Sequence, residues 1–284
     1  MVSNNGVVLV ARKKYSNSVA KNERWIKEGR GAGRNQEYKP WLTVRDLPSE
    51  GRSHRVFGQK SQRTYHLFSD LELAVFLLLE WHSDTQEIRE QFPLQLEVTV
   101  ELAKEAGIVH PANAGVLQYM SSDFLVNADN PEKPKFVLQA KYAEALSDKR
   151  TIEKLELERR YWGKKEVPWF LITEQDIPGT VFQNINWLYP AQRDEIDNDE
   201  ILQRVQFYTH QFKDNPKSTL LNIAKSIDVA YELPLGESLR EIRQLLAKRC
   251  FLFDIYEPVV KLVAGDLRQT DTHMLIEALY VSNK

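Results

Sequence analysis

Two short apolar runs, Phe124–Val126 and Phe136–Leu138, stand on either side of a segment rich in Asn, Asp, Pro and Lys. A polar connection of this kind between two apolar runs is typical of a β-hairpin with a long loop. Side chains alternate between the two faces of a strand, so Val137, Gln139 and Lys141 share one face. The pattern therefore predicts a hairpin whose second strand ends with an amide and an amine on the same face.

Antiparallel pairing brings an acidic residue to the same end of this hairpin. With the loop centred near Glu132, Asp123 is expected opposite Lys141 and Leu125 opposite Gln139. One interpretation is an Asp–Lys ion pair on a half-solvated sheet, which is common and contributes little. The other is a carboxylate metal ligand with a lysine beside it. The hairpin alone does not decide between them.

The stretch FSDLELAVFLLLEWHS predicts a buried helix. Ser69 can cap its N-terminus, Asp70 and Glu72 fall in the first turn, and the body of the segment is apolar nearly all round. Ser69-x-x-Glu72 also matches a capping box, in which the glutamate accepts a hydrogen bond from the start of the helix. Glu72 is therefore either a capping residue or an acid that the helix brings to the end of the hairpin.

The segments around the hairpin complete a mixed α/β core. IREQFPL predicts a short strand, and RTIEKLELERRYWGKKEVPWFLIT predicts a charged helix, a turn at Gly163 and a buried strand at Trp169–Thr173. The order of helix, hairpin, helix and strand favours a buried helix packed beneath a sheet. PWLTVRDLPSEGRSHRVFG predicts an irregular or short-stranded layer with four candidate DNA contacts: Arg45, Arg52, His54 and Arg55.

The chain after Thr173 has a different composition. Leu220, Ile223 and Ile227 follow a helical stripe, and SLREIRQLLAKR predicts a second helix after a turn at Gly236. CFLFDI then predicts a strand. This region is acidic overall, which favours docking to a protein over reading DNA. Its candidate DNA contacts are Arg240, Arg243, Lys248 and Arg249.

Charge is unevenly distributed along the chain. Up to Thr64 there are fourteen lysines and arginines against five acidic residues, and the remainder holds 24 basic and 35 acidic residues. The first segment is thus predicted to be an arm that faces a polyanion. Cys250 is the only cysteine, which excludes an intramolecular disulfide and fits a reducing cytoplasm. The apolar runs Gly6–Ala11 and Leu73–Leu79 are too short for a secretory signal or a membrane span, so we expect a soluble protein.

The order of Glu72 on a helix, Asp123 at a strand start and Gln139-x-Lys141 at the end of the next strand resembles the restriction-endonuclease-like core. The longer words are more specific: PWLTVRDLPSEGRSHR, SDLELAVFLLLEW, IREQFPL, SSDFLV, QAK, IEKLELERRYW and VPWF. Together they resemble the TnsA family, the endonuclease subunits of heteromeric, Tn-seven-like cut-and-paste transposases. In this family, unlike most relatives of the fold, Gln occupies the position of Gln139.

This resemblance implies a metal-dependent endonuclease that hydrolyses DNA at the 5′ ends of a transposon. Glu72, Asp123 and Gln139 are expected to bind Mg²⁺, or Mn²⁺ in its place, and Lys141 to orient the attacking water or stabilise the transition state. The resemblance also implies a basic arm and restriction-endonuclease-like catalytic domain over residues 1–173. A winged-helix-like domain is expected over residues 174–284.

The expected partners follow from the same resemblance. They are double-stranded DNA at the transposon ends, a DDE-type (TnsB-like) transposase that cuts the 3′ ends, and an AAA+ (TnsC-like) ATPase regulator held by the C-terminal domain. The expected compartment is the bacterial cytoplasm, with no membrane partner. Two alternatives remain open: a free-standing restriction or repair nuclease would cut DNA alone, and a non-catalytic adaptor would bridge DNA and the ATPase without needing a metal.

Overall fold

The computed structural model describes residues 19–46 and 52–276, which form two compact units. The first unit holds the described residues up to Leu73 together with Asp84–Glu174, and the second holds Ala74–Ser83 and the described residues from Gln175 onward. The sequence predicts a division after Thr173. In the structure the chain passes between the units after Glu174, and Ala74–Ser83 also belongs to the second. Residues 1–18 of the predicted basic arm lie outside the described residues.

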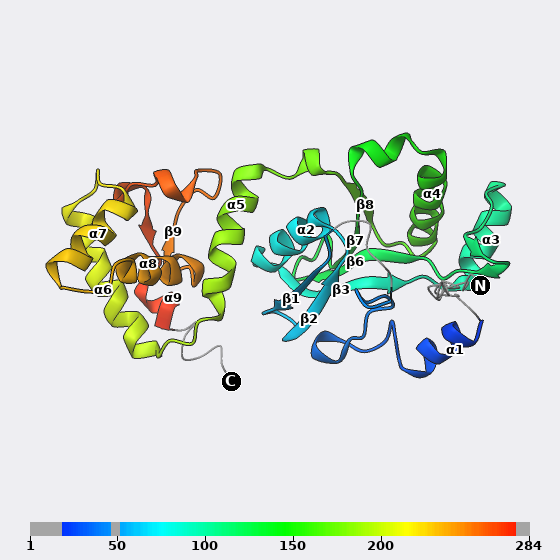
Figure 1. Cartoon of the computed structure of the whole chain (residues 1–284), viewed down its shortest axis with the longest axis horizontal. Coiled ribbons are helices and arrows are strands. Elements are labelled where there is room, and N and C mark those ends of the chain that lie inside the picture. Colours follow the sequence, from blue (N-terminus) through cyan, green and yellow to red (C-terminus); the bar gives the residue numbers. More distant parts are fainter. Residues whose placement is uncertain (1–18, 47–51, 277–284) are drawn as a thin grey trace, which may run out of the picture. The chain divides into compact units, whose positions relative to one another are not determined.

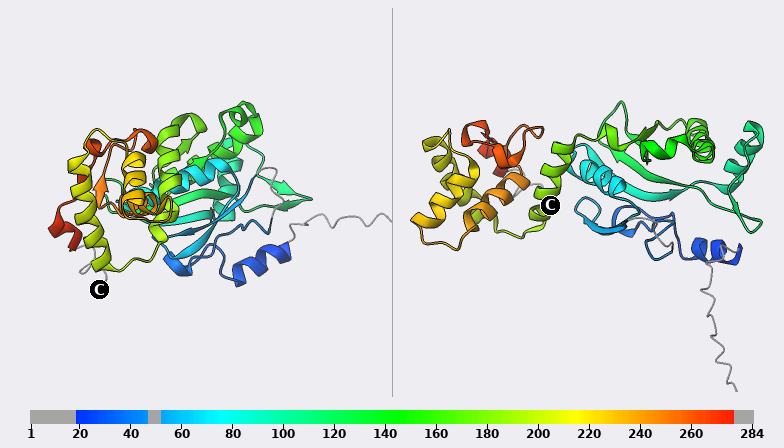
Figure 2. Two further views of the ribbon diagram at one scale, coloured as in Figure 1. Left: turned by 60° about the vertical axis from the view of Figure 1, so that its left-hand side comes forward. Right: turned by 45° about the horizontal axis from the view of Figure 1, so that its top comes forward.

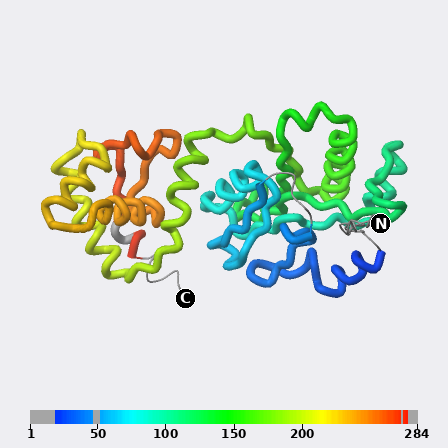
Figure 3. The backbone as a smooth tube through the Cα atoms, viewed as in Figure 1, coloured from blue at the N-terminus to red at the C-terminus, as the bar shows by residue number. Residues whose placement is uncertain are grey.

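Four strands of the described chain form the mixed sheet of the first unit, in the order β3, β6, β7, β8 (Figure 1). β6 pairs antiparallel with β3 and with β7, whereas β7 and β8 are parallel. Parallel neighbours need a crossover connection, and helix α4 supplies it; its path can be followed in Figure 3. The bounds are β3 Thr85–Pro93, β6 Ser121–Ala128, β7 Lys135–Ala140, α4 Lys149–Lys164 and β8 Trp169–Ile172.

The predicted hairpin is confirmed as β6 and β7, but its predicted register is wrong by two residues. Leu125 pairs with Val137 and not with Gln139, so continuing the register places Asp123 opposite Gln139 instead of Lys141. The connection is two residues shorter on the β7 side than a centre at Glu132 assumes, because Asn127 pairs with Lys135 and the centre falls at Pro131. Because the shift is an even number of residues, every side chain keeps its predicted face.

Helices α3 (Leu96–Ala106) and α4 supply the core on one face of the sheet. Leu157 and Trp162 of α4 pack with Leu102 of α3 against Leu125 and Val137 of the hairpin strands, and all five side chains are buried. Figures 1 and 2 show α1 (Val19–Lys27) on the opposite side of the sheet from α4. The sheet therefore has helices on both sides.

The end of α4 differs from the prediction of a turn at Gly163. The helix continues through Gly163 to Lys164, and the chain then reverses at Glu166, whose φ is 56°. No φ in the left-handed range is needed at Gly163, so this glycine does not end the helix. The reversal delivers the chain to β8, which confirms the predicted strand but not its predicted burial: β8 is the last strand in the sheet order, and none of its residues is buried.

The layer before the buried helix is short-stranded, as predicted. β1 (His54–Gly58) and β2 (Arg63–Leu67) pair antiparallel, and α2 (Asp70–Trp81) follows directly. Ser69 caps α2: the Glu72 backbone N–H donates to Ser69 Oγ over 3.0 Å. The remaining short elements of this unit are η1 Asn35–Glu37, β4 Ala112–Asn113, β5 Val116–Leu117 and η2 Ala143–Ser147, and η3 Glu174–Asp176 spans the passage to the second unit.

The second unit is mainly helical. The two helices predicted from SLREIRQLLAKR and the stripe before it are confirmed as α8 and α7, whereas α5 and α6 lie in a region where the sequence analysis placed no element. The predicted strand is only two residues long and pairs antiparallel with β10. The bounds are α5 Gly179–Leu188, η4 Tyr189–Arg193, α6 Asn198–Asp214, α7 Leu220–Ala230, α8 Glu237–Ala247, β9 Phe251–Leu252, η5 Val259–Lys261, η6 Ala264–Asp266, β10 Arg268–Gln269 and α9 Thr272–Ile276.

Candidate active site

The four predicted catalytic residues meet in one cavity of the first unit. Its volume is about 650 Å³, and Glu72, Asp123, Gln139 and Lys141 all line it. They come from the first turn of α2, from β6, from β7 and from the residue just after β7. The remaining lining residues are Leu42, Phe68, Gln91, Pro111, Tyr119, Met120, Ser121, Ala145, Thr151, Lys154, Leu155 and Glu158.

Asp123 and Gln139 are locked together by the strand register. The Asp123 backbone N–H donates to Gln139 Oε1 over 2.9 Å, and the Ala140 N–H donates to Asp123 Oδ2 over 2.9 Å. The Asp123 residue is only 6% exposed. These contacts replace the predicted Asp123–Lys141 cross-strand pair and fix the orientation of both oxygen-bearing side chains.

Glu72 serves as a cap and also faces the cavity. The Phe68 backbone N–H donates to Glu72 Oε2 over 3.0 Å, and Ser69 Oγ lies 3.3 Å from Glu72 Oε1. The predicted capping arrangement therefore forms, with the N–H of the residue before the cap as the donor. Since the same carboxyl lines the cavity with Asp123, the two interpretations of Glu72 are compatible.

Gln91, which the sequence analysis did not single out, connects the two acids. Its Nε2 group donates to Glu72 Oε2 over 3.4 Å and to Asp123 Oδ1 over 3.3 Å, while its Oε1 atom accepts from Ser121 Oγ over 3.0 Å. Gln91 is buried within β3 and has a φ of 47°, a left-handed conformation that is costly for a residue other than glycine. The backbone at this point is held in an uncommon conformation that directs the amide between two carboxyl groups.

Burial and mutual proximity raise the pKa values of both acids. Burial, reinforced by the charge of Asp123, raises the pKa of Glu72 to about 8. Burial likewise raises the pKa of Asp123, with Lys141 and the bonded N–H groups opposing the change. An upward pKa shift in two adjacent carboxyl groups of a cavity is typical of a functional site. Such a pair favours either a shared proton or a cation.

A third acid, Glu158, reaches the cavity from α4. Its Oε1 atom accepts hydrogen bonds from Ser122 Oγ over 2.7 Å and from Trp169 Nε1 over 2.9 Å. Burial raises its pKa to about 8. The sequence does hold a signal for this residue, since Glu158 falls one turn after Leu155 on the buried face of a helix, where an unpaired charge is rare.

The oxygen atoms at this cavity suit a hard cation that takes only a few of its ligands from the protein. Among residues 19–46 and 52–276, no three His, Cys, Asp or Glu side chains are grouped so that they could hold a metal ion. The available oxygens are those of Glu72 and Asp123 together with the Gln139 amide oxygen, which the Asp123 N–H already approaches. Two carboxylates and an amide leave coordination positions for water and substrate oxygens, which is the manner in which Mg²⁺ usually binds to proteins.

The predicted DNA contacts in the first unit differ in their surroundings. Arg45, Arg52 and Arg55 have exposed side chains. The fourth, His54, lies with its Nε2 atom 2.7 Å from Asp70 Oδ1 at the start of α2.

The predicted DNA contacts in the second unit mostly contact other residues of that unit. Arg240 forms an ion pair with Glu237 one turn away on the exposed face of α8. Arg243 donates from Nε to the Trp187 carbonyl over 2.7 Å, and Arg249 contacts the Trp81 carbonyl and ring. Lys248 is half-buried at the end of α8. The guanidinium groups of Arg243 and Arg249 therefore stabilise this unit through internal contacts.

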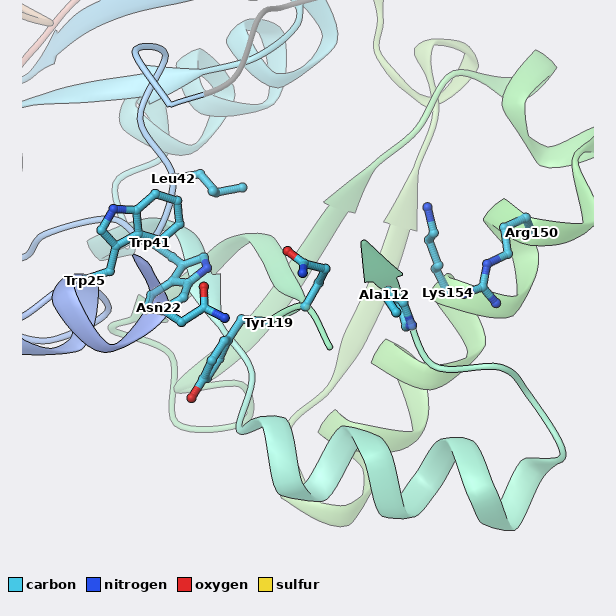
Figure 4. Close-up of a pocket in the computed structure, with 10 residues that line it drawn as sticks. Asn22, Trp25, Trp41, Leu42, Ala112, Tyr119, Arg150 and Lys154 are labelled. Carbon is cyan, nitrogen blue, oxygen red and sulfur yellow. The ribbon is translucent and has the colours of Figure 1, made fainter. Parts of the chain in front are cut away.

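A second cavity, of about 370 Å³, adjoins the acidic one and is drawn in Figure 4. The two cavities share Leu42, Pro111, Tyr119 and Lys154 as lining residues. The other residues around the second cavity are Asn22, Trp25, Trp41, Ala112, Gln118 and Arg150.

Among the helices of the described residues, none combines the length and the apolar character required to cross a membrane.

Comparisons with known proteins agree with this arrangement. The family model for the TnsA-like endonuclease N terminal region matches residues 82–174, and that for the TnsA endonuclease C terminal region matches residues 176–255. The transposon Tn7 transposition protein TnsA of Escherichia coli is 44% identical over 274 residues, which cover 96% of this chain and all of that protein. This relation confirms the resemblance predicted from the sequence. The chain belongs to the TnsA family of transposition endonucleases.

Proposed function

We propose that this transposase endonuclease subunit hydrolyses a DNA phosphodiester at the 5′ ends of a transposon with the help of Mg²⁺, and that its first unit is a restriction-endonuclease-like domain. The observation that carries the proposal is the convergence of Glu72, Asp123, Gln139 and Lys141 in one cavity. The raised pKa values of the two acids support it, because a site that favours a cation also favours a proton when the cation is absent.

Each residue has a role that follows from its surroundings. Glu72 and Asp123 would hold the ion through carboxylate oxygens, and the Gln139 amide would contribute a weaker, neutral oxygen. When bound, Mg²⁺ supplies charge that stabilises the phosphoryl oxygens and acidifies water. Lys141 lies at the same cavity and lowers the pKa of both acids, so its positive charge reaches the site where negative charge develops during hydrolysis.

Hydrolysis by this set needs the carboxylates to be free of protons. At pH 7 the proton on Glu72 must leave before the group can bind a cation, since its pKa is about 8 in the folded protein. Gln91 donates to both acids and keeps them turned toward the same space after the proton leaves. Metal affinity should therefore increase as the pH rises through about 8.

The second unit is proposed as the docking module for an AAA+ ATPase, with a DDE-type transposase cutting the other strand. The pairing of α7 and α8 with the small β9–β10 sheet supports a winged-helix relationship. Leu221, Leu239 and Val260 line an apolar cavity of about 260 Å³ in this unit, and Val260 is 81% exposed. An apolar surface and internally engaged arginines favour a protein partner over DNA.

A strand-specific cleavage assay in the complete transposition reaction tests this function. Asp123→Asn preserves the side-chain volume and an oxygen for the Ala140 N–H but removes the charge. We expect loss of 5′-strand cutting, with 3′-strand cutting by the partner transposase retained. Normal 5′ cutting by this variant would show that Asp123 is structural. Cutting by the wild-type chain alone, without partners, would instead favour a free-standing nuclease.

A further inference from the structure

Residues 30–46 form a segment that runs along β3, and we call it the strap. β3 lies at one edge of the sheet, since β6 is its neighbour on one side and no strand of the described chain pairs with the other. The strap passes so close to the end of β3 that a Cβ atom on Gly31 would collide with the Pro93 ring. Further along, the Trp41 backbone N–H donates to the Gln91 carbonyl over 3.1 Å. The strap therefore contacts the backbone of the strand at the residue that connects the two acids.

The backbone of Trp41 is itself held by a shielded ion pair. Arg30 Nη1 donates to the Trp41 carbonyl over 3.0 Å and to Asp46 Oδ2 over 2.6 Å. The same Asp46 oxygen accepts from the Thr43 N–H over 2.8 Å. The Arg30 and Asp46 side chains are only 16% and 14% exposed, so this pair is screened by solvent less than a surface ion pair. Arg30 thus holds Trp41 at its carbonyl while the N–H of Trp41 reaches Gln91.

The Trp41 ring links the strap to the acidic cavity. It meets the Trp25 ring edge to face with the centroids 5.2 Å apart and the Tyr119 ring at 4.6 Å, and Figure 4 shows the three rings together. Tyr119 lines the acidic cavity, as does Leu42, the residue after Trp41. Close packing on both sides of its ring leaves Trp41 little room to move away from β3.

The conformation of Gln91 needs support of this kind. Its φ of 47° costs about 1–3 kcal/mol for a residue other than glycine and persists only where the surroundings hold it. The hydrogen bond from Trp41 acts on the Gln91 carbonyl, and the Gln91 amide donates to Glu72 and Asp123. Without the strap, the Gln91 backbone can relax to an extended conformation, which changes the direction of its side chain.

We propose that Arg30 and Trp41 are positioning residues for the divalent cation: the strap holds Gln91 in its left-handed conformation, and Gln91 keeps the two acids where the cation needs them. Neither Arg30 nor Trp41 lines the acidic cavity, so their effect passes through Gln91. The reverse effect follows by linkage, since a cation that binds more tightly when the strap is closed also keeps the strap closed. This inference rests on the proposed function and adds to it a control of metal affinity by residues 30–46.

Calorimetric titration of the full chain with Mn²⁺ at pH 8 tests the inference. Arg30→Met keeps the length of the side chain but removes the guanidinium group, and its Mn²⁺ affinity should decrease about fivefold, the equivalent of one hydrogen bond. Asp46→Asn is a milder change that keeps one acceptor oxygen, and its affinity should decrease by a smaller factor. Arg34→Ala is the matched control, because Arg34 also lies in the strap and binds β3, but at Glu87 and not at Gln91. It should bind Mn²⁺ as wild type does.

A double-mutant cycle shows whether the strap acts through Gln91. Gln91→Ala alone should weaken Mn²⁺ binding about tenfold. If Gln91 carries the effect, Arg30→Met causes no further decrease in the Gln91→Ala background. Independent effects would instead multiply to about fiftyfold, and that result would overturn the inference. Equal Mn²⁺ affinities of Arg30→Met and Arg34→Ala would overturn it too.

Hydrogen exchange of the wild-type chain provides a second measurement that needs no variant of the strap. The Trp41 amide is followed by nuclear magnetic resonance with and without saturating Mg²⁺. Its exchange should slow about fivefold when the ion binds, by the factor that the closed strap adds to the affinity. This slowing should be absent in Gln91→Ala. An unchanged Trp41 exchange rate in wild type contradicts the inference, even if Arg30→Met does not fold.

Asp123→Asn separates this inference from the proposed function. If Mn²⁺ binding depends on Asp123 while Arg30→Met and Asp46→Asn bind as wild type does, the role of the strap is refuted and the nuclease assignment stands. If wild type binds no Mn²⁺, or Asp123→Asn binds it equally well, the metal site fails and the inference fails with it. Urea unfolding at pH 8 checks that each variant compared in affinity is folded.

Discussion

Glu158→Gln should make the protein less sensitive to alkaline pH. Glu158 is buried and accepts hydrogen bonds from Ser122 and Trp169, and burial raises its pKa from 4.5 to about 8. The folded protein thus keeps this proton up to about pH 8, whereas the unfolded chain releases it near pH 4.5. The contribution of Glu158 to the free energy of unfolding is therefore fully present below pH 4.5 and is lost as the pH increases through 8. A glutamine keeps an acceptor oxygen and cannot ionise.

The size of the effect follows from the same pKa values. The interval from 4.5 to 8 corresponds to about 5 kcal/mol at about 1.4 kcal/mol for each tenfold change in proton affinity. This value is a ceiling, because a buried carboxylate can gain water or a cation once it ionises. Even half of it would be a large part of the total stability of a domain, which is about 5–15 kcal/mol.

Urea unfolding followed by circular dichroism at pH 5 and pH 8.5 measures this difference. Wild type should lose several kcal/mol between the two conditions, and Glu158→Gln should lose less. Glu156→Gln is the matched control on the same helix, since hydrogen bonds from Arg159 and Arg160 lower the Glu156 pKa to about 2 and it stays ionised throughout this range. An equal loss of stability in wild type and Glu158→Gln would refute the reasoning.

Three further variants probe the acidic cavity. Glu72→Gln should keep the helix cap and the melting temperature but lose 5′-strand cutting; lower stability with cutting retained would identify Glu72 as a cap alone. Gln91→Ala should weaken Mn²⁺ binding about tenfold in calorimetry, as for other residues that orient ligands. Gln62→Ala is the control, since it changes an exposed glutamine at a similar φ of 49°, and it should leave Mn²⁺ affinity unchanged. An equal loss of Mn²⁺ affinity in Gln91→Ala and Gln62→Ala would show that the Gln91 side chain does not orient the ligands. Lys141→Ala should bind Mn²⁺ normally and lose turnover; loss of Mn²⁺ binding would make the lysine structural.

Local patterns predict the elements of the site well. Alternation places Asp123, Gln139 and Lys141 on predictable faces of a hairpin, and Ser69 with Glu72 marks the start of a helix. These features depend on residues close together in sequence. The register depends instead on how the long loop closes, and its two-residue error changed the partner of Asp123 from Lys141 to Gln139 without changing the face.

Features set by tertiary packing were not accessible from one sequence. Nothing in IREQFPL indicates that Gln91 has a positive φ or that its amide reaches two acids on other elements. Similarly, the helical pattern predicts Arg243 and Arg249 as DNA contacts. In the structure they contact the backbone carbonyl groups of Trp187 and Trp81, which are far from them in the sequence. Distant partners of this kind decide whether a charged side chain serves the fold or a ligand.

Binding of Mn²⁺ to the full chain, measured by isothermal titration calorimetry at pH 8, tests the central claim most directly. The claim is that Glu72 and Asp123 form a site for a divalent cation. Wild type should bind Mn²⁺ with release of protons, because the carboxyl groups must ionise to act as ligands. Asp123→Asn should lose this binding while it remains folded. If Asp123→Asn binds Mn²⁺ with the affinity and proton release of wild type, the acidic cavity is not the metal site.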